Sequence, residues 1–237
     1  MYRTAVRLAF VCLLAAGIAL PSLALPVAES SGSVRSVRDF DKVEISIPGE
    51  VILTQGATES LEIVASADDL ARISTAVSMG TLRIASVRPD DSPRGRITYK
   101  LTMKSVAALT TSSSGSIRAG RIETDRLAIA IHSSGSVTIG TLSASTLVVE
   151  ISSSGAVTVA GTVERQTLKS SSSGEYRAED LASREATVSL SSSGRATIRV
   201  SEQLTGSLSS SGDVRYRGNP PKVTVSASSS GRLVKLD

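Results

Sequence analysis

Residues that could carry out chemistry are few and scattered in this 237-residue chain. It contains one histidine, His132, and one cysteine, Cys12, so most metal sites and catalytic triads lack the residues they need. The acidic residues Glu150, Glu175 and Asp213 occupy unrelated positions relative to one another, and no carboxylate pair is placed for acid-base catalysis. The sequence also contains no phosphate-binding loop, nucleotide fingerprint or nucleophile elbow. We therefore expect no enzyme activity, no metal site and no cofactor.

Hydroxyl side chains are abundant by contrast, because the chain holds 43 serines. Many of them belong to a Ser-Ser-Gly motif that recurs every 18 to 20 residues, and its glycines are Gly115, Gly135, Gly155, Gly174, Gly194, Gly212 and Gly231. The residue three before each glycine forms a candidate surface row: Ser112, His132, Ser152, Ser171, Ser191, Ser209 and Ser228. Such a row could bind a polymer, a glycan or ordered water, and an ordinary solvated corner is the simpler interpretation. A single surface histidine such as His132 usually has no special role.

The positions around the motif repeat with the period of a β-strand. In most rungs apolar residues stand six and four positions before the glycine and two and four positions after it, so they share one parity; the exceptions before the glycine are Gly206, Thr111 and Ser170. The set six before the glycine is Leu109, Ile129, Val149, Leu168, Val188 and Val225. A unit of about 20 residues cannot bury its apolar face alone, whereas stacked units bury one face against the next. The sequence therefore predicts an all-β fold, a parallel β-helix or β-solenoid with Ser-Gly rungs.

The motif also predicts how each rung turns. Glycine tolerates the backbone angles of a sharp bend, so we expect the bend at the glycine, and the parity predicts that the serine two before it points inward. A looser return segment such as residues 140–146 would then lead into the next strand.

The N-terminal half lacks the motif but keeps the alternation, for example at Val43, Ile45 and Ile47. Residues 68–73 are the one plausible short helical piece. We expect residues 39–104 to continue the β-stack and to cap one end, because an open solenoid end invites edge pairing. The predicted domain spans residues 39–236, with an N-terminal β half at 39–104 and a repeat half at 105–236.

The first residues have the features of a secretory signal peptide. Arg3 and Arg7 precede an apolar run from Leu8 to Leu20, which is shorter than a membrane span, and small residues stand at Ser22 and Ala24. Cleavage after residue 24 would remove the cysteine and two of the charges behind the formal net charge of +4. The near-neutral remainder gives no case for nucleic acid, and a cysteine-free chain suits an oxidising compartment. We expect residues 25–38 to be a flexible leader.

Three segments resemble the opening of the auto-transporter adhesin head GIN domain family: residues 38–43 (RDFDKV), 51–56 (VILTQG) and 80–84 (GTLRI). The Ser-Gly rungs and the segment 216–220 (YRGNP) are also similar, so the resemblance covers roughly residues 39–236. The family's rungs usually read Gly-Ser-Gly-Asp, whereas here Ser replaces the first glycine and Asp follows only at Asp213. The resemblance implies an exported bacterial β-helical domain with a role in adhesion and no catalytic residues.

These observations favour a non-enzymatic, exported module that binds the cell envelope through its solenoid surface. An outward row of threonine and arginine would suit an anionic glycan or lipid head group, although any exposed strand tolerates such residues; the row is Arg118, Thr138, Thr158, Arg177, Thr197 and Arg215. The alternative is an envelope stress sensor or scaffold that contacts another envelope protein, because the domain also resembles the β-solenoid sensor modules of such systems. We expect a periplasmic location, with the cell surface or the exterior as alternatives.

Overall fold

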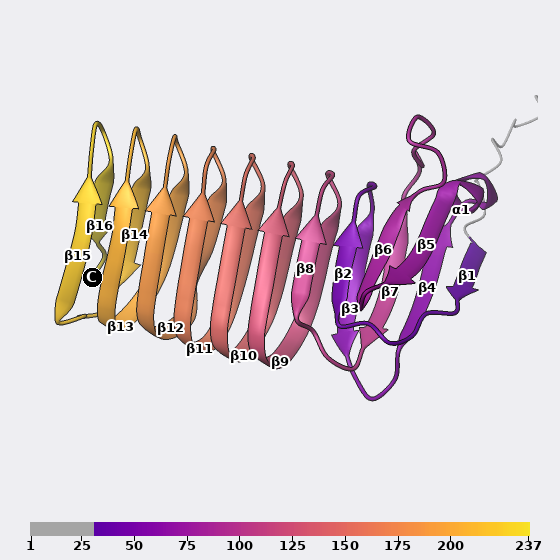
Figure 1. The fold of residues 1–237 in the computed structure, drawn as a ribbon, viewed down its shortest axis with the longest axis horizontal. Helices are drawn as coiled ribbons and strands as arrows, with labels where there is room; N and C mark the ends of the chain where they lie inside the picture. The colour runs from indigo at the N-terminus through magenta and orange to yellow at the C-terminus, as the bar shows by residue number, and fades with distance from the viewer. Residues whose placement is uncertain (1–30) are drawn as a thin grey trace, which may run out of the picture.

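The alternation of apolar and polar residues becomes a continuous set of strands with one buried side. The computed structural model describes residues 31–237, so the predicted signal peptide and residues 25–30 lie outside the described residues. Sixteen strands form one sheet, which winds into a β-solenoid of about 6 turns (Figure 1). The predicted fold class is therefore confirmed.

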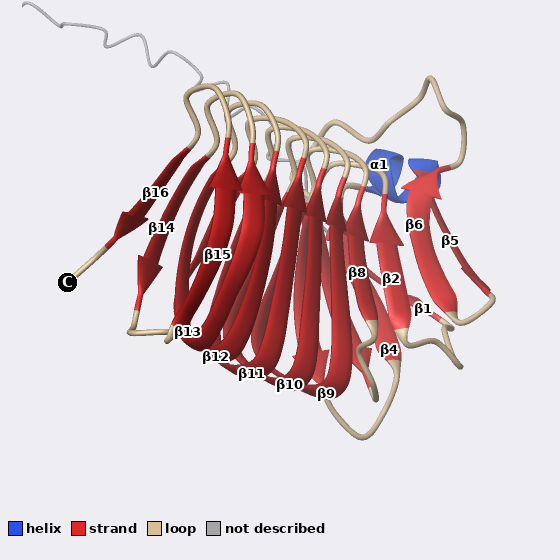
Figure 2. Cartoon of the chain, turned by 60° about the vertical axis from the view of Figure 1, so that its left-hand side comes forward, coloured by secondary structure: helices blue, strands red, loops and turns tan. Residues whose placement is uncertain are grey.

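Five long strands form the repeat: β9 (Ser116–Ile131), β10 (Ser136–Ile151), β11 (Ala156–Ser170), β12 (Glu175–Leu190) and β13 (Arg195–Leu208). Each runs down one side of the solenoid, bends through an arc and returns up the other side to a Ser-Gly loop (Figure 2). Neighbouring strands are parallel and in register, with Ser116 beside Ser136 and Ser136 beside Ala156.

The prediction of a looser return segment is wrong. Residues 140–146 lie within β10, where Thr141 and Leu142 pair with Arg121 and Ile122 of β9. Leu142 and Ile122 are both fully buried. An inward apolar residue fills the arc, so the bent segment stays within the strand, although the register shifts at this point between β10 and β11, β11 and β12, and β12 and β13.

The solenoid has two faces. The front face carries β5 (Ile73–Ser78) and the strands that run toward the loop edge: β6 (Thr81–Ser86), β2 (Lys42–Ile45), β8 (Ala108–Thr111), the second halves of β9 to β13, and β15 (Lys222–Ala227). The back face carries β1 (Ser31–Arg35), β4 (Ser60–Ala65), β7 (Thr98–Met103), β3 (Glu50–Gln55), the first halves of β9 to β13, β14 (Asp213–Arg217) and β16 (Arg232–Lys235). The core lies between the two faces.

The N-terminal half continues the stack, but not in the order of the chain. β2 and β3 form a rung that lies between the β6/β7 rung and the β8/β9 rung. Its turn at residues 46–49 matches a Ser-Gly loop, because the Gly49 carbonyl accepts the N–H of Ser116 at 2.9 Å and the Gly115 carbonyl accepts that of Ser136 at 3.2 Å. The motif is missing here, yet the same rung is built.

Antiparallel strands close the N-terminal end. β5 pairs with β6, and β4 pairs with both β7 and β1, all in the antiparallel sense. The short helix α1 (Ala67–Arg72) follows β4 and begins at Ser66, whose hydroxyl accepts the N–H of Asp69 at 3.2 Å. The predicted helical piece and the predicted cap are thus both found.

The flexible-leader prediction is wrong for residues 31–35. These residues form β1, which pairs with β4 from Ser31 opposite Ala65 to Arg35 opposite Leu61. The Val34 side chain is 80 % exposed, so backbone pairing rather than apolar burial holds this strand. A strand of this kind leaves no apolar pattern in the sequence.

The predicted inward positions form the core. Five of the six apolar residues that stand six before a motif glycine are buried: Leu109, Ile129, Val149, Leu168 and Val188. One buried polar cluster interrupts the apolar packing, because the Tyr176 hydroxyl donates to Gln166 Oε1 at 2.9 Å and Gln166 Nε2 donates to Ser183 Oγ at 2.7 Å. These polar groups satisfy one another, which makes their burial tolerable.

Candidate functional site

The seven Ser-Gly loops line one edge of the solenoid (Figure 2). The residue three before each glycine is exposed at Ser112, His132, Ser152, Ser171, Ser191 and Ser228, and half-buried at Ser209. Backbone pairing sets the row, since the N–H groups of Ser152 and Ser191 donate to the carbonyls of Ile131 and Ser170, both at 2.9 Å. His132 lies within the row, with Nδ1 3.2 Å from Ser152 Oγ. The row is therefore a regular, exposed line of small polar groups.

The motif glycines do not make the bend, contrary to the sequence prediction. None of the seven has a positive φ, whereas the serine two before the glycine has φ values of 78° at Ser192, 61° at Ser210 and 59° at Ser229. The glycines are needed for space instead. A Cβ at Gly155 would lie 2.9 Å from the carbonyl oxygen of Gly135 in the preceding rung. Close contact between rungs, rather than backbone freedom, explains these glycines.

The serine two before the glycine does not point into the core as predicted. This residue is half-buried in the first four loops and exposed at Ser192, Ser210 and Ser229. The left-handed backbone at these three serines turns the side chain outward. The Ser192 hydroxyl still reaches the preceding rung, where it donates to the Ser171 carbonyl at 3.2 Å.

A larger hydroxyl surface extends from the last three serines of this row onto the front face, and the sequence analysis missed its other six residues. Three successive rungs, formed by β12, β13 and β15, each present threonine, serine and serine at alternate, outward positions. We call these nine residues the hydroxyl array: Thr187, Ser189, Ser191, Thr205, Ser207, Ser209, Thr224, Ser226 and Ser228. Its signal is visible in the sequence as Thr-x-Ser-x-Ser before each of the last three Ser-Gly motifs.

The register of the parallel strands makes the array regular. Thr187 pairs with Thr205 and Thr205 with Thr224, while the serines two positions later pair in the same way. The hydroxyl rows are therefore about 4.8 Å apart between rungs and about 6.7 Å apart along each strand. All nine side chains are exposed or half-buried. Five of the nine have a side-chain contact: Ser189 Oγ lies 3.4 Å from Ser207 Oγ, Gln203 Nε2 donates to Thr205 Oγ1 at 3.0 Å, and the hydroxyls of Ser191 and Ser228 each lie 3.5 Å from a carbonyl of the preceding rung.

The threonine and arginine row on the back face offers less to an anion than its composition suggests. Each arginine has a carboxylate partner: Arg118 Nε lies 3.1 Å from Glu50, Arg177 Nε 2.9 Å from Glu175, and Arg215 Nε 3.4 Å from Asp213. These ion pairs neutralise the row, so an incoming phosphate or carboxylate would have to compete with them.

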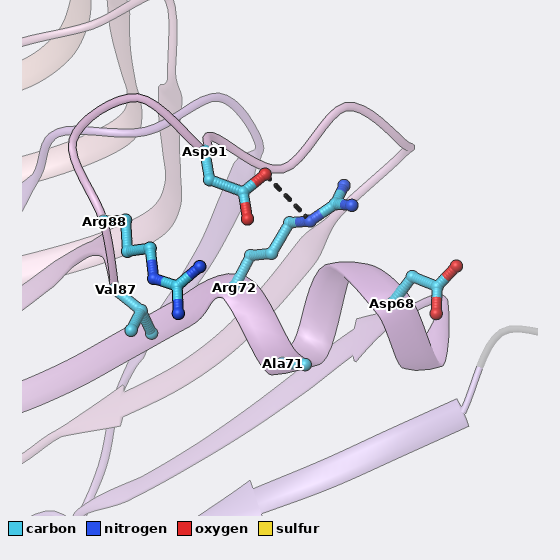
Figure 3. Close-up of a pocket in the computed structure, with 6 residues that line it drawn as sticks. All are labelled: Asp68, Ala71, Arg72, Val87, Arg88 and Asp91. Carbon is cyan, nitrogen blue, oxygen red and sulfur yellow. Dashed lines mark ion pairs between the residues drawn. The ribbon is translucent and has the colours of Figure 1, made fainter.

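A cleft at the N-terminal end is lined by charged residues of α1 and of the loop after β6 (Figure 3). Arg72 Nε lies 3.1 Å from an Asp91 oxygen across it. Beneath, the buried Asp69 accepts the backbone N–H of Arg94 at 3.0 Å and the Ser66 hydroxyl at 2.8 Å. The hydrogen bond from Arg94 holds the pKa of Asp69 below its ordinary value. These contacts anchor residues 88–96, and the cleft contains no nucleophile or histidine base.

A shallow apolar groove lies on the arc side of the repeat. Val163 and Val200 form part of its floor, and Arg184 crosses its rim between Glu164 at 2.9 Å and Glu202 at 2.7 Å. Elsewhere, residues 31–237 contain no group of three histidine, cysteine or acidic residues able to hold a metal ion. No helix in this part of the chain is long and apolar enough to cross a membrane.

Solved structures share the fold at low sequence identity. A crystal structure of a "putative adhesin" from Bacteroides fragilis has a TM-score of 0.80 at 22% identity, over 89% of this chain and 99% of that one. A "putative lipid binding protein" from Parabacteroides distasonis has a TM-score of 0.67 at 22% identity, over 88% and 97%. A "putative adhesin" from Parabacteroides merdae has a TM-score of 0.64 at 18% identity, over 88% and 97%. No curated protein matches the sequence significantly.

The sequence also matches a family model directly. The match covers residues 39–220, which takes in the N-terminal rungs and all but the last of the Ser-Gly loops. This span agrees with the segments that carry the resemblance in the sequence, and the solved structures agree with it in fold. The chain therefore belongs to the family described as "Putative auto-transporter adhesin, head GIN domain".

Proposed function

We propose that the protein is an exported, non-enzymatic adhesion module of the cell envelope, and that it binds neutral polysaccharide through the hydroxyl array. The observation that carries this proposal is the array itself, nine outward hydroxyl-bearing residues in register on three rungs. The family description favours adhesion, and the predicted signal peptide favours export to the periplasm or the surface.

The chemistry of the array favours a hydroxyl-rich, uncharged ligand. Each hydroxyl both donates and accepts hydrogen bonds, so it matches the hydroxyl groups of a sugar in either sense. Each single bond contributes little in water, but a polymer that meets several rows at once gains from effective concentration. The array carries no charge of its own, whereas the arginines of the back face are neutralised. Neutral polysaccharide is therefore a better match than a phosphate-bearing lipid head group.

The contacts of two acidic side chains support a non-enzymatic role. Glu150 lies 3.6 Å from Lys169 Nζ, and Glu175 is paired with Arg177. A glycan-cleaving site needs two carboxylates facing one sugar bond, one of them held protonated. Each of these two carboxylates faces a cation rather than a second carboxylate, so they do not form the pair that such a site needs.

Co-sedimentation with insoluble envelope polysaccharide tests this proposal. The probes are an insoluble neutral polysaccharide such as chitin, protease-treated peptidoglycan, whose stem peptides carry charge, and the outer-membrane fraction, each at low and high salt. Thr187→Val with Thr205→Val removes two adjacent hydroxyls from the array at nearly constant shape, and Thr138→Val with Thr158→Val does the same on the back face. We expect the first pair to weaken salt-resistant capture about tenfold or more and the second to leave it unchanged.

Three outcomes would overturn the proposal or a part of it. Equal capture of both variants would show that the array is not the contact surface. Capture that disappears when the fractions are treated with protease would show that the ligand is a protein. New reducing ends in the polysaccharide after incubation would revive an enzymatic role.

A further inference from the structure

One line of residues crosses the front face on seven successive rungs, whose strands lie side by side in Figure 2. Each residue stands seven positions before a motif glycine and carries a methyl group, so we call this line the methyl row: Ala108, Ala128, Val148, Thr167, Thr187, Thr205 and Thr224. Every member pairs with the next in register. All are exposed or half-buried, and none is charged. At about 4.8 Å per rung the row is about 29 Å long, and its last three members belong to the hydroxyl array.

The strip between the methyl row and the loop edge is flat and nearly neutral. It contains the outward residues five and three positions before each motif glycine, and most of these are serine, threonine or alanine. Its charged residues, Glu150 and Lys169, approach to 3.6 Å and neutralise each other. Short side chains on strands in register build no walls around a ligand. The front face is therefore suited to contact with another flat surface.

A single polysaccharide chain gains little from the array. Lying along the solenoid it follows one line of the array, and lying along a strand it follows one rung, so it meets three of the nine hydroxyl-bearing residues. One net hydrogen bond in water strengthens binding about tenfold or less, so three give a dissociation constant no lower than about 1 mM. The line at the loop edge is longer, but the hydroxyls of Ser152, Ser191 and Ser228 already lie 3.4–3.5 Å from carbonyls of the preceding rung.

Stacking on aromatic rings does not add to this contact. None of the four aromatic residues in residues 31–237 is exposed, because Phe40, Tyr99 and Tyr176 are buried and Tyr216 of the back face is half-buried. Aromatic side chains offer the largest rigid contact area to another ring. Sites for small molecules also bury most of the ligand, which a flat face does not do. A soluble chain would therefore stay largely in water.

An ordered surface removes these limits. Chains packed side by side in a solid have already lost their conformational freedom, so binding does not have to fix them. Several chains present hydroxyl groups in parallel lines and meet several rows of the array at once. The methyl groups of the row add apolar contact with the C–H groups of the sugars over the rungs that precede the array.

We propose that the front face binds the ordered surface of a solid neutral polysaccharide, in which chains lie side by side, and does not hold single soluble chains. This inference rests on the proposed function and specifies the form of its ligand. The array supplies the hydrogen bonds, and the methyl row extends the contact to β8, β9 and β10.

Binding to one polysaccharide in three forms tests the proposal, with the protein left in the supernatant as the measurement. The probes are crystalline chitin, the same chitin made amorphous by swelling in acid, and a soluble chitin oligosaccharide as competitor. We expect the crystalline form to bind about tenfold more tightly than the amorphous form, and about 0.1 mM oligosaccharide to displace no protein. Equal binding of the two solid forms, or displacement at that concentration, would overturn the proposal. So would a lack of capture by the crystalline forms of both chitin and cellulose.

Variants on the two faces locate the contact. Ala128 lies on the methyl row three rungs before Thr187, about 14 Å away, so Ala128→Arg places a protruding side chain on the face and removes no array hydroxyl. We expect it to weaken capture by crystalline chitin about tenfold. Ala156→Arg makes the same change at a half-buried position of the back face and should leave capture unchanged. Equal capture of both variants, each with the melting temperature of wild type, would overturn the extended contact.

The two proposals can fail separately. If crystalline and amorphous chitin bind equally, and Thr187→Val with Thr205→Val weakens capture of both, polysaccharide binding through the array stands and the ordered-surface inference fails. If the same variant binds crystalline chitin as wild type does, whereas Ala128→Arg does not, the front face is the contact and the array proposal fails.

Discussion

The two ends of the solenoid finish the same sheet in different ways. At the N-terminal end the strand direction reverses, and β1, β4 and β5 pair antiparallel while α1 packs beside β4. At the C-terminal end of the described chain, the last strands of the parallel ladder are β15 and β16. Ile63 near the first end is fully buried, whereas Val223 at the second is 42 % exposed. Closing a solenoid therefore requires strands that do not repeat, and the repeat alone leaves its last core residues in water.

Core truncation at each end should give the largest contrast. Ile63→Ala removes a fully buried side chain from the capped end, and we expect the free energy of unfolding to fall by about 2–5 kcal/mol. Val223→Ala at the open end should cost less than about 1 kcal/mol, because water already reaches the side chain. Urea denaturation followed by circular dichroism measures both. Similar losses would mean that the open end is covered in solution.

Alanine at the motif glycines should separate inner rungs from the outermost rung. Gly155→Ala places a Cβ 2.9 Å from the carbonyl oxygens of Gly135 and Ser133, and we expect a loss of about 1–3 kcal/mol. At Gly231 the nearest atom is Leu208 Cβ of the preceding rung, 3.0 Å away, so a smaller shift relieves the contact and Gly231→Ala should change stability by less than about 1 kcal/mol. The same denaturation experiment measures both. A tolerated alanine at Gly155 would contradict the close-contact explanation of the motif.

The buried carboxylate of the capped end should give the smaller, pH-dependent effect. Asp69 has a lowered pKa in the folded state, so its stabilisation is present above the unfolded value near 3.8 and is lost as the pH falls through the folded value. Asp69→Asn should lower stability by about 1–3 kcal/mol at pH 7, and the difference from wild type should shrink below about pH 4. Thermal denaturation across this pH range is the measurement. Asp237→Asn at the exposed C-terminal end is the control and should stay within about 0.5 kcal/mol of wild type.

The fold follows from the sequence because strand parity is a local property. Once Leu109 and Ile129 are assigned to one face, the position of every second residue is fixed, and the burial of Val188 follows. The order of the N-terminal rungs could not be predicted in this way. Alternation at Val43 and Leu82 has the same period, and nothing in that period states that β2 lies between β6 and β8.

The role of the glycines in the Ser-Gly loops was harder to predict, because glycine is found for two different structural reasons. Glycine suits both a bend and a close contact, and only the structure separates the buried Gly155 from the left-handed Ser192. The hydroxyl array was missed for another reason. Thr187, Ser189 and their partners have outward parity, and outward polar residues were expected to be ordinary solvated positions. Their regular order is apparent only when three rungs are placed side by side.

The position of β2 and β3 has a consequence for how the chain folds. In the repeat, a new strand finds its partner about one rung back, as Ser136 finds Ser116. Lys42 of β2 pairs with Thr81 on one side and Ala108 on the other, and both partners come much later in the chain. Forming these pairs therefore closes longer loops than pairing between neighbouring repeat strands does. Repeat rungs can nucleate anywhere and propagate to their neighbours. We therefore expect the rungs of β9 to β13 to form quickly. We expect β2 and β3 to pair with their neighbours late, although they are synthesised early. Assembly of the N-terminal rungs is then the rate-limiting step of folding.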